Sequence, residues 1–388
     1  MVGGAGPFAS GLPWWQHVED VVAAAAAAGC DVTVLRLLGG RPAPGRSAAG
    51  GRVTYLAELH AGSPQRAPAP EDLDPGSHPL RQPWAEPGGP AADLAWATSA
   101  LREGGLELSA RPVQVRTWNL SSIWRLPLAG GSAWLKVVPP FFAHEGAVLR
   151  WVGDRRPGLV PAVLAGGAGR VVLADVPGED QYGAGVEVAV EAAVRLAGLQ
   201  AGAAGEVDDL LRLGVTDWRL PAYEAEVAAS IDRAGGALDE HERRVLGAIV
   251  DGLDRRATAL ADCGVPDSLV HGDFHLGNIR RDGAGPLGFL DWGDSGVGHP
   301  LLDVAALGAG RTADDRAALL ASVEATWRTL VPGCDPARAL DLLGPLAGLR
   351  DAVVFERFLA AIEPSERCYH VHDPLVALRR AASAGAPG

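Results

Sequence analysis

Three polar residues in one stretch of the sequence have the types and the order that phosphoryl transfer requires. Asn278 follows Asp273 by five residues, and a second carboxylate, Asp291, comes thirteen residues after Asn278. Transfer of phosphate from a nucleotide needs one carboxylate to orient and deprotonate the attacking hydroxyl. It also needs an amide oxygen and a second carboxylate to hold Mg²⁺ against the phosphates. We therefore predict that Asp273 is the catalytic base and that Asn278 and Asp291 are ligands of Mg²⁺.

The alternative for these residues is a loop in which Asp and Asn only form turns and helix caps, as they often do. Two observations favour the catalytic interpretation. The chain contains only two asparagines, Asn119 and Asn278. The second carboxylate, Asp291, also follows the first motif at the distance of a hairpin.

A single lysine supports the same chemistry. Lys and Arg total 34, yet Lys136 is the only lysine. Every other strongly basic side chain in the sequence is therefore an arginine. It stands in a strand-like run at 133–138, and a predicted helix at 142–152 carries Glu145. We predict that Lys136 contacts the α- and β-phosphates and that Glu145 holds it in place. The alternative, an exposed lysine on an edge strand, fits poorly with the apolar residues on either side.

The loop at 118–123 lies between the first two predicted strands of this region. It lacks the glycines of a Gly-rich phosphate loop, but Ser121 and Ser122 could let hydroxyl and backbone N–H groups approach phosphate oxygens. A plain hairpin turn explains the same residues equally well. Both interpretations stay open at this stage.

Other residues near the motif have weaker signals. His275, Asp294 and Trp218 are candidates for contacting the acceptor molecule. His271 is expected to brace the backbone of the catalytic loop, and Asp303 to begin a helix. A metal site built from the His and Asp residues of this region would indicate a hydrolase instead, but no ligand spacing supports it.

The order of predicted elements indicates an α+β protein with two lobes, a small sheet with one helix followed by a larger helical lobe. Strands are predicted at 113–117, 123–128, 133–138, 160–164 and 170–174, and helices at 186–204, 221–235, 239–262, 301–330 and 336–362. The expected division is a kinase-like sheet region at 106–178 and a helical region at 179–388. Before them, residues 1–105 form an extra segment with helices at 17–29 and 91–103, strands at 32–38 and 52–59, and Pro/Gly-rich stretches at 39–51 and 61–90.

Three motifs carry a resemblance to a known family. They are H-G-D-F-H-x-G-N at 271–278, D-W-G-D at 291–294 and G-H-P-x-x-D-x-A at 298–305. They resemble the aminoglycoside phosphotransferase and choline-kinase-like family, which has a protein-kinase-like fold. The resemblance covers residues 111–375. It leaves the first 105 residues without a counterpart. Their elements resemble those of a Nudix domain, but the Nudix catalytic motif is absent.

The resemblance implies a kinase that moves the γ-phosphate of ATP or GTP to a small-molecule hydroxyl. It places Asp273, Asn278, Asp291, Lys136 and Glu145 in the roles given above. The implied acceptor is an antibiotic, such as an aminoglycoside or a nucleoside antibiotic of the capuramycin type. A primary metabolite such as choline, homoserine or a sugar-like alcohol is the alternative.

The resemblance also makes residues 173–178 the hinge, where the backbone around Asp175 and Val176 would bond the purine. A rival from another class is a nucleotide-binding pseudokinase that acts as a scaffold. Such a protein would be expected to have lost the base, the lysine or a metal ligand, and this chain retains all of them.

Composition excludes some other classes. The net charge of −13 argues against a nucleic-acid partner, which would call for a basic surface. The longest apolar run is too short to span a bilayer. The four cysteines are far apart and form no metal-binding pair, so reduced thiols and a cytoplasmic location are expected. We expect a monomer or homodimer without a membrane partner.

Overall fold

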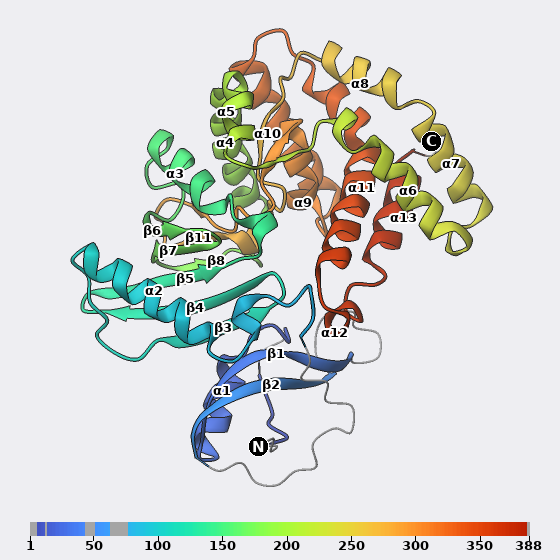
Figure 1. Cartoon of the computed structure of the whole chain (residues 1–388). Helices are drawn as coiled ribbons and strands as arrows, with labels where there is room; N and C mark the ends of the chain where they lie inside the picture. Colours follow the sequence, from blue (N-terminus) through green and yellow to red (C-terminus); the bar gives the residue numbers. More distant parts are fainter. Residues whose placement is uncertain (1–5, 12–13, 43–50, 63–76, 386–388) are drawn as a thin grey trace. The chain divides into compact units, whose positions relative to one another are not determined.

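The computed structural model describes residues 6–11, 14–42, 51–62 and 77–385. The chain divides into two units, each with its own interior (Figure 1). Unit 1 comprises Met1–Ala143, Val163–Asp175 and Phe358–Val371, and unit 2 comprises His144–Ala162, Val176–Arg357 and His372–Gly388. The segments 43–50 and 63–76 of the predicted Pro/Gly-rich stretches lie outside the described residues.

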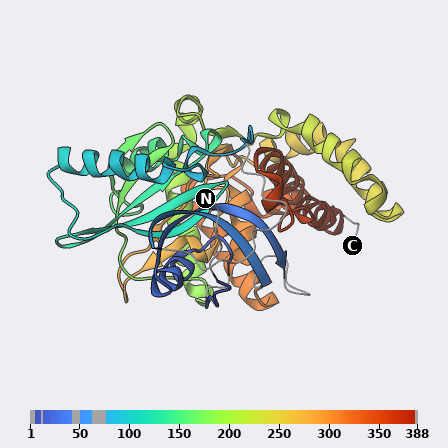
Figure 2. The same ribbon diagram turned by 60° about the horizontal axis from the view of Figure 1, so that its bottom comes forward.

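Unit 1 is built on a five-stranded antiparallel sheet with the order β3-β4-β5-β7-β6. Its strands are β3 (Val113–Trp118), β4 (Ser121–Leu128), β5 (Gly131–Val137), β6 (Val163–Gly167) and β7 (Arg170–Ala174). Helix α2 (Gly89–Glu103) lies along one face of this sheet (Figure 2). It buries Ala97 and Leu101 against Trp124 and Leu135 of the strands. The five predicted strands are confirmed, with shifted ends.

The N-terminal segment of unit 1 packs on the edge strand β3. It contains α1 (Glu19–Ala27) and an antiparallel pair, β1 (Cys30–Pro42) and β2 (Gly51–Gly62). The backbone N–H of Val18 donates to the Val115 carbonyl over 3.0 Å, and that of Val34 donates to the Gln114 side chain over 2.9 Å. The Val18 bond satisfies part of the open backbone edge of β3, and residues 1–105 belong to the same unit as the sheet.

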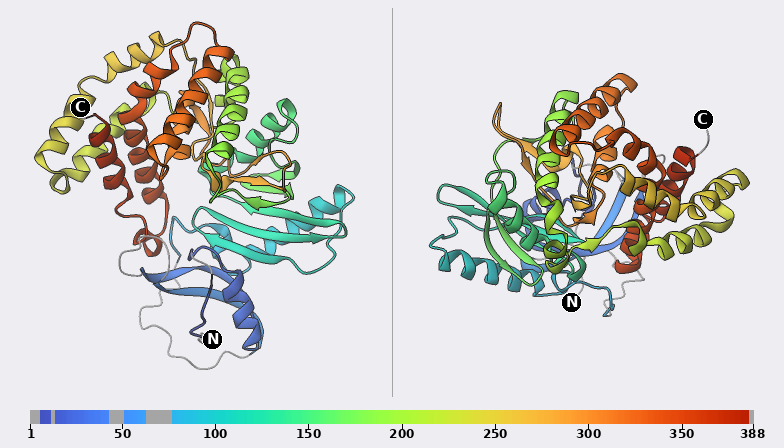
Figure 3. Two further views of the ribbon diagram at one scale, coloured as in Figure 1. Left: turned by 180° about the vertical axis from the view of Figure 1, so that it is seen from behind. Right: turned by 90° about the horizontal axis from the view of Figure 1, so that it is seen from above.

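Unit 2 is mainly helical. Its longer helices are α3 (Glu145–Arg155), α4 (Val186–Ala203), α6 (Glu224–Ala234), α7 (Glu240–Val250), α8 (Leu253–Asp262), α10 (Ala313–Leu330), α11 (Pro336–Ala361) and α13 (Asp373–Gly385). Figure 3 shows α4 beside α10, and α11 beside α13. Gly348 permits the second contact, because a Cβ there would lie 2.7 Å from the Ala381 nitrogen. The single helix predicted at 239–262 is wrong: it breaks at Gly252, a poor helix former, into α7 and α8.

Short strands in unit 2 hold the motif-bearing loops. Strand β10 (Ser268–Val270) pairs with β13 (Gly296–Gly298), and β11 (Ile279–Arg281) pairs with β12 (Gly288–Phe289). The loop at 271–278, called the catalytic loop after its expected role, therefore leaves β10 and enters β11, and the Asp291 turn connects β12 with β13. Within the described part of the chain, none of the helices combines the length and apolarity needed to cross a bilayer.

Candidate active site

The loop after β10 brings Asp273 and Asn278 together. The Asn278 side-chain nitrogen donates to the Asp273 backbone oxygen over 2.9 Å and to its carboxylate oxygen Oδ2 over 3.2 Å. Asparagine uses its nitrogen in both bonds, so its amide oxygen is directed elsewhere. The Asp273 side chain is 48% exposed and can be reached from solvent.

His275 holds the second position beside the Asp273 carboxylate. Its Nδ1 accepts from the Gly277 N–H over 3.0 Å, and its Nε2 lies 3.4 Å from Asp273 Oδ2. Burial alone would raise the pKa of Asp273, but the His275 hydrogen bond and charge outweigh it, and the net pKa is lowered. The same hydrogen bond raises the pKa of His275. Asp273 is therefore an ionised carboxylate near neutral pH, the state that a base requires.

His271 links the two motifs through its ring. Its Nε2–H donates to the Leu290 carbonyl over 2.9 Å, and its Nδ1 accepts from the Asp273 N–H over 3.4 Å. Complete burial lowers the pKa of His271, so the ring is neutral with its proton on Nε2. This arrangement is the backbone brace expected for His271.

Asp291 has an unusual backbone. Its φ is 60°, and it is the only non-glycine residue with positive φ within the described ranges. Such a conformation is strained for a residue with a Cβ and is found most often at functional sites. The turn is held on both sides: the Leu290 N–H donates to the Asn278 carbonyl over 2.8 Å, and the Trp292 N–H donates to Glu145 Oε1 over 3.1 Å.

The donor set around this turn fits Mg²⁺. The Asn278 amide oxygen and the Asp291 carboxylate are hard oxygen ligands on two segments that a backbone hydrogen bond joins. Mg²⁺ usually takes one or two carboxylates and completes its shell with phosphates and water. In the residues that the structure describes, no three or more His, Cys, Asp or Glu side chains gather to hold a metal.

Asp303 is a brace of the catalytic loop that the sequence analysis missed. Its Oδ2 accepts from the His271 N–H over 2.8 Å and its Oδ1 from the Gly272 N–H over 2.9 Å. Gln200 of α4 donates to the same Oδ2 over 2.8 Å. Asp303 stands at the N-cap position of α9 (Val304–Gly308), as expected of a helix-start acid, but its side chain makes no cap bond there and holds the catalytic loop instead.

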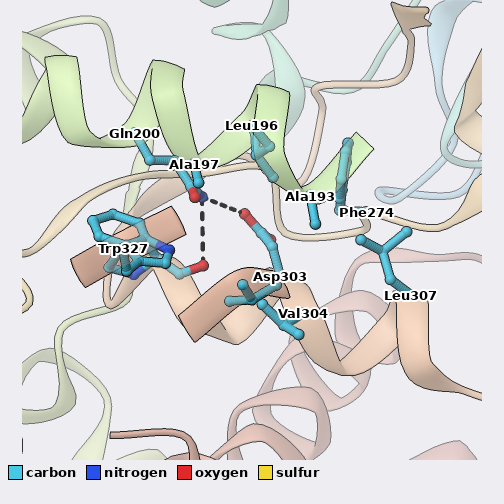
Figure 4. A pocket seen from close by; sticks show the side chains of 11 residues that line it. Ala193, Leu196, Ala197, Gln200, Phe274, Asp303, Val304, Leu307 and Trp327 are labelled. Carbon is cyan, nitrogen blue, oxygen red and sulfur yellow. Dashed lines mark hydrogen bonds between the residues drawn. The ribbon is translucent and has the colours of Figure 1, made fainter. Parts of the chain in front are cut away.

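A small, mostly apolar pocket surrounds the Asp303 carboxylate (Figure 4). Residues of α4, α9 and α10 line it together with Phe274 of the catalytic loop. Gln200 reaches across it to Asp303 and to the Pro300 carbonyl, as the dashed lines show. Burial raises the pKa of Asp303, and the His271 ring and the backbone N–H donors offset only part of that rise.

Gly272 is required by a close approach of two backbones. Its φ is 88°, and a Cβ there would lie 2.1 Å from the Asp294 carbonyl oxygen. Arg350 of α11 donates to the Gly272 carbonyl over 3.2 Å from the other side. No local sequence signal pointed to Arg350 or Gln200, because both reach the loop from distant helices.

We expect Asp303→Asn to lower stability by about 2–4 kcal/mol, because its NH₂ group would face N–H donors in a buried site. Turnover should fall at least ~10-fold as the loop carrying Asp273 shifts. Urea unfolding and phosphotransfer assays measure the two effects. The control is Asp239→Asn at the exposed N-cap of α7, where Asn caps as well as Asp. If Asp303→Asn kept the stability and turnover of the control variant, the bracing role of Asp303 would be refuted.

Three of the predicted nucleotide residues, Lys136, Ser121 and Ser122, are buried in the sheet of unit 1. Lys136 is 9% exposed on β5, the central strand, opposite Ile123 and Val171. The exposed edge-strand alternative for Lys136 is therefore wrong. Ser121 and Ser122 are buried and accept indole N–H bonds from Trp118 and Trp124, over 2.9 and 3.1 Å. Their contact with phosphate stays a prediction.

One of the boundaries between the units falls between Asp175 and Val176, in the predicted hinge. Asp175 accepts from the Trp134 indole over 2.6 Å within unit 1. The Val176 carbonyl accepts from Arg280 over 2.9 Å within unit 2. Purine binding there stays a prediction, as does the pairing of Lys136 with Glu145.

The three acceptor candidates occupy different surroundings in unit 2. His275 contacts Asp273, and the Asp294 backbone packs against Gly272. Trp218 is 6% exposed, and the guanidinium groups of Arg350 and Arg357 lie 4.8 and 4.7 Å from its ring. These contacts favour a packing role for Trp218, and acceptor binding by all three stays a prediction.

The family of the chain follows from its sequence and fold. The model of the phosphotransferase enzyme family matches residues 109–340, more than half of the 388-residue chain. No curated protein matches by sequence. Among solved structures, the choline kinase LicA from Streptococcus pneumoniae is similar at 15% identity and a TM-score of 0.54, over 76% of this chain and 99% of that one. A type I macrolide 2'-phosphotransferase is similar at 18% identity and a TM-score of 0.51, over 73% and 97%.

This chain belongs to the phosphotransferase enzyme family. Its α+β architecture is the kinase-like fold of the solved structures, which at these identities are evidence for the fold alone. The expected family and fold class are confirmed. The chain is thus a small-molecule phosphotransferase, and family membership implies ATP as its co-substrate.

Proposed function

We propose that this enzyme transfers the γ-phosphate of ATP or GTP to a hydroxyl group of a small molecule, with Asp273 as the base. The observation that carries the proposal is the cluster of Asp273, Asn278 and Asp291, joined by hydrogen bonds through Asn278 and His271. An ionised carboxylate, an amide oxygen and a second carboxylate in a strained turn are the groups that the reaction needs.

The contacts of Asp273 suggest which atom takes the proton. Both Asn278 and His275 reach Oδ2, so Oδ1 would accept the hydroxyl proton of the acceptor. The hydroxyl oxygen then forms the bond to the γ-phosphorus, and the bond from that phosphorus to the β–γ bridging oxygen breaks. Mg²⁺ held by Asn278 and Asp291 would neutralise charge on the phosphates. His271 and Asp303 keep the loop in place during this step.

The acceptor that we propose first is a hydroxyl-bearing antibiotic, either an aminoglycoside or a nucleoside antibiotic of the capuramycin type. This choice rests on the resemblance of the kinase core at 111–375 to the antibiotic-inactivating branch of the family, since the motifs themselves indicate the reaction and not the acceptor. A primary metabolite such as choline, homoserine or a sugar-like alcohol is the alternative.

A panel of hydroxyl-bearing antibiotics and metabolites, each with ATP and with GTP, tests the proposal. Transfer of labelled γ-phosphate to one panel member and its loss in Asp273→Asn would support it. Mg²⁺-dependent nucleotide binding without transfer to any acceptor would favour the pseudokinase scaffold. Absence of nucleotide binding would overturn both.

We also expect Lys136→Arg to lower turnover at least ~10-fold, although the charge is kept. Arg is longer, planar and forked, and a misplacement of about 1 Å in a catalytic site can cost more than that. The residue stands in a buried position of the central strand, where a longer side chain cannot move aside freely. Steady-state kinetics with saturating acceptor measure the effect.

The matched control is Arg125→Lys on β4 of the same sheet. Arg125 forms an exposed ion pair with Glu19, so its loss should cost at most about 1 kcal/mol of stability and leave turnover unchanged. Full activity of Lys136→Arg would remove Lys136 from the nucleotide site. A loss shared by both variants would point to damage of the sheet instead.

A further inference from the structure

The turn between β3 and β4, at Asn119 and Leu120, is held by residues from distant parts of the sequence. The Asn119 N–H donates to Glu366 Oε2 over 3.0 Å. The Trp118 carbonyl accepts from the Trp84 indole over 3.0 Å, and the Trp118 indole donates to Ser121. All of these residues lie in unit 1. The backbone of the turn is therefore tied on one side to the N-terminal segment and on the other to α12 (Pro364–Arg367).

Packing adds to these bonds. The Trp118 ring lies 6.1 Å from Trp15, 6.2 Å from Phe358 and 6.2 Å from His370, measured between ring centres. Trp15 in turn stacks on Tyr369 at 5.2 Å. The last residue of β3 is thus enclosed by aromatic rings, and the turn that follows it has little freedom to move.

Glu366 is unusual among the groups that hold the turn. It is 1% exposed, and its Oε1 has no hydrogen-bond partner among the described residues. Burying a carboxyl with an unsatisfied oxygen is costly, and a neutral side chain of the same shape would avoid most of that cost. Stability therefore does not explain why an acid stands here.

The two serine hydroxyl groups that follow the turn suggest why its position would matter for nucleotide binding. Ser121 and Ser122 each accept an indole N–H, and a hydroxyl that accepts one bond keeps its own hydrogen for donation. Those hydrogens could be donated to phosphate oxygens only if the turn holds its position. We propose that Glu366 is a positioning residue for the nucleotide: through the Asn119 N–H it fixes the β3–β4 turn that faces the phosphates. This inference rests on the proposed function.

The proposal predicts a pH dependence with a definite sign. Burial raises the pKa of Glu366 to about 7, the nearby Glu363 adds to the rise, and the Asn119 bonds oppose it. Above that pH the ionised carboxylate holds the N–H by a charge-assisted bond, roughly twice as strong as the neutral one that remains below it. Nucleotide affinity supplied by Glu366 is therefore present at pH 8 and lost at pH 6.

Other ionisable groups around Glu366 must be separated from it. Glu363 is paired with Arg81 over 3.0 Å. Tyr55 of β2 and Cys368 interact electrostatically with Glu366, and the imidazole of His370 contacts the Trp118 ring. All of them are retained in Glu366→Gln, as is the titration of the nucleotide itself. The ratio of the variant's nucleotide affinity to that of wild type, compared between the two pH values, therefore isolates the effect of Glu366 ionisation.

The test measures the Kd of the full-length chain for Mg·ATP by calorimetry at pH 6 and pH 8. For Glu366→Gln we expect a Kd about 3- to 10-fold above wild type at pH 8 and close to wild type at pH 6, with kcat at saturating nucleotide changed less than Kd. Glu366→Ala should show a larger rise at pH 8. Glu363→Gln, at a buried acid of the same segment that bonds no atom of the turn, is the matched control: its Kd at pH 8 should equal that of wild type. Because Glu363 raises the pKa of Glu366, the Kd of this control at pH 6 should not exceed the wild-type value.

The possible results distinguish failure of this inference from failure of the proposed function on which it rests. Wild-type Kd values in Glu366→Gln at both pH values would overturn the inference and leave the proposed function standing. An equal rise at both pH values, shared by Glu363→Gln, would show general loosening of the segment and also overturn it. Absence of Mg·ATP binding in the wild type would overturn the proposed function and this inference with it.

Discussion

Replacing Asp273 by Asn should lower turnover by ~10²–10⁴, the usual contribution of a general base. Asn has nearly the shape of Asp and can still accept a bond from His275, so the catalytic loop should keep its fold. It has no carboxylate to receive the hydroxyl proton. Nucleotide affinity should change little, because the predicted phosphate and metal contacts come from other residues. Single-turnover phosphotransfer and calorimetry with Mg·ATP measure the two quantities.

The control for Asp273→Asn is Asp262→Asn, the same change at an exposed residue that ends α8 in the same unit. It should retain wild-type turnover. Near-wild-type turnover of Asp273→Asn would rule out Asp273 as the base. A loss of nucleotide binding equal to the loss of turnover would instead assign Asp273 to the metal site.

Removal of the Asp291 carboxylate should have the second large effect. Asp291→Ala deletes a hard ligand and a negative charge from a cation site, so the Mg²⁺ concentration for half-maximal nucleotide binding should rise at least ~10-fold, a loss that even outer-shell partners of a metal can cause. Asn278→Ala should have a smaller effect, because an amide oxygen carries no net charge. Binding of ATP titrated over Mg²⁺ concentration measures both.

A glycine variant separates metal binding from backbone strain. Asp291 has a φ of 60°, a conformation that Gly adopts at no steric cost and Ala does not. Asp291→Gly should therefore be more stable than Asp291→Ala by about 1–2 kcal/mol, yet equally defective in Mg²⁺ dependence. Wild-type Mg²⁺ dependence in Asp291→Gly would show that this carboxylate is not a metal ligand.

The types and order of the proposed catalytic residues could be recognised in the sequence because these residues lie close together in it. Asp273 and Asn278 stand in one short loop, so their hydrogen bond needs only local geometry. Lys136 could be placed in a buried strand from the apolar residues beside it, and the structure puts it on the central strand. The break between α7 and α8 was missed because two helices of similar pattern flank a single weak residue, Gly252.

The residues that hold the site in place could not be predicted. Gln200 and Arg350 meet the catalytic loop from helices α4 and α11, and Glu366 meets the β3–β4 turn from 247 residues away. No periodicity or spacing encodes which distant side chain will meet a given backbone N–H. The membership of residues 358–371 in unit 1 likewise depends on contacts between residues far apart in the chain.

The sequence by itself determined the family of this protein and the chemistry proposed for it, because an acid, an amide and a second acid at short spacing limit what a loop can do, and the only lysine is the candidate for a compact charge at the nucleotide. The tertiary structure decided how these groups are held. It set the neutral tautomer of His271, the three hydrogen bonds that the Asp303 carboxylate accepts, and the strained turn at Asp291. The physical reason is that the state of a side chain depends on burial and on its partners, and both are set by contacts between residues far apart in the chain.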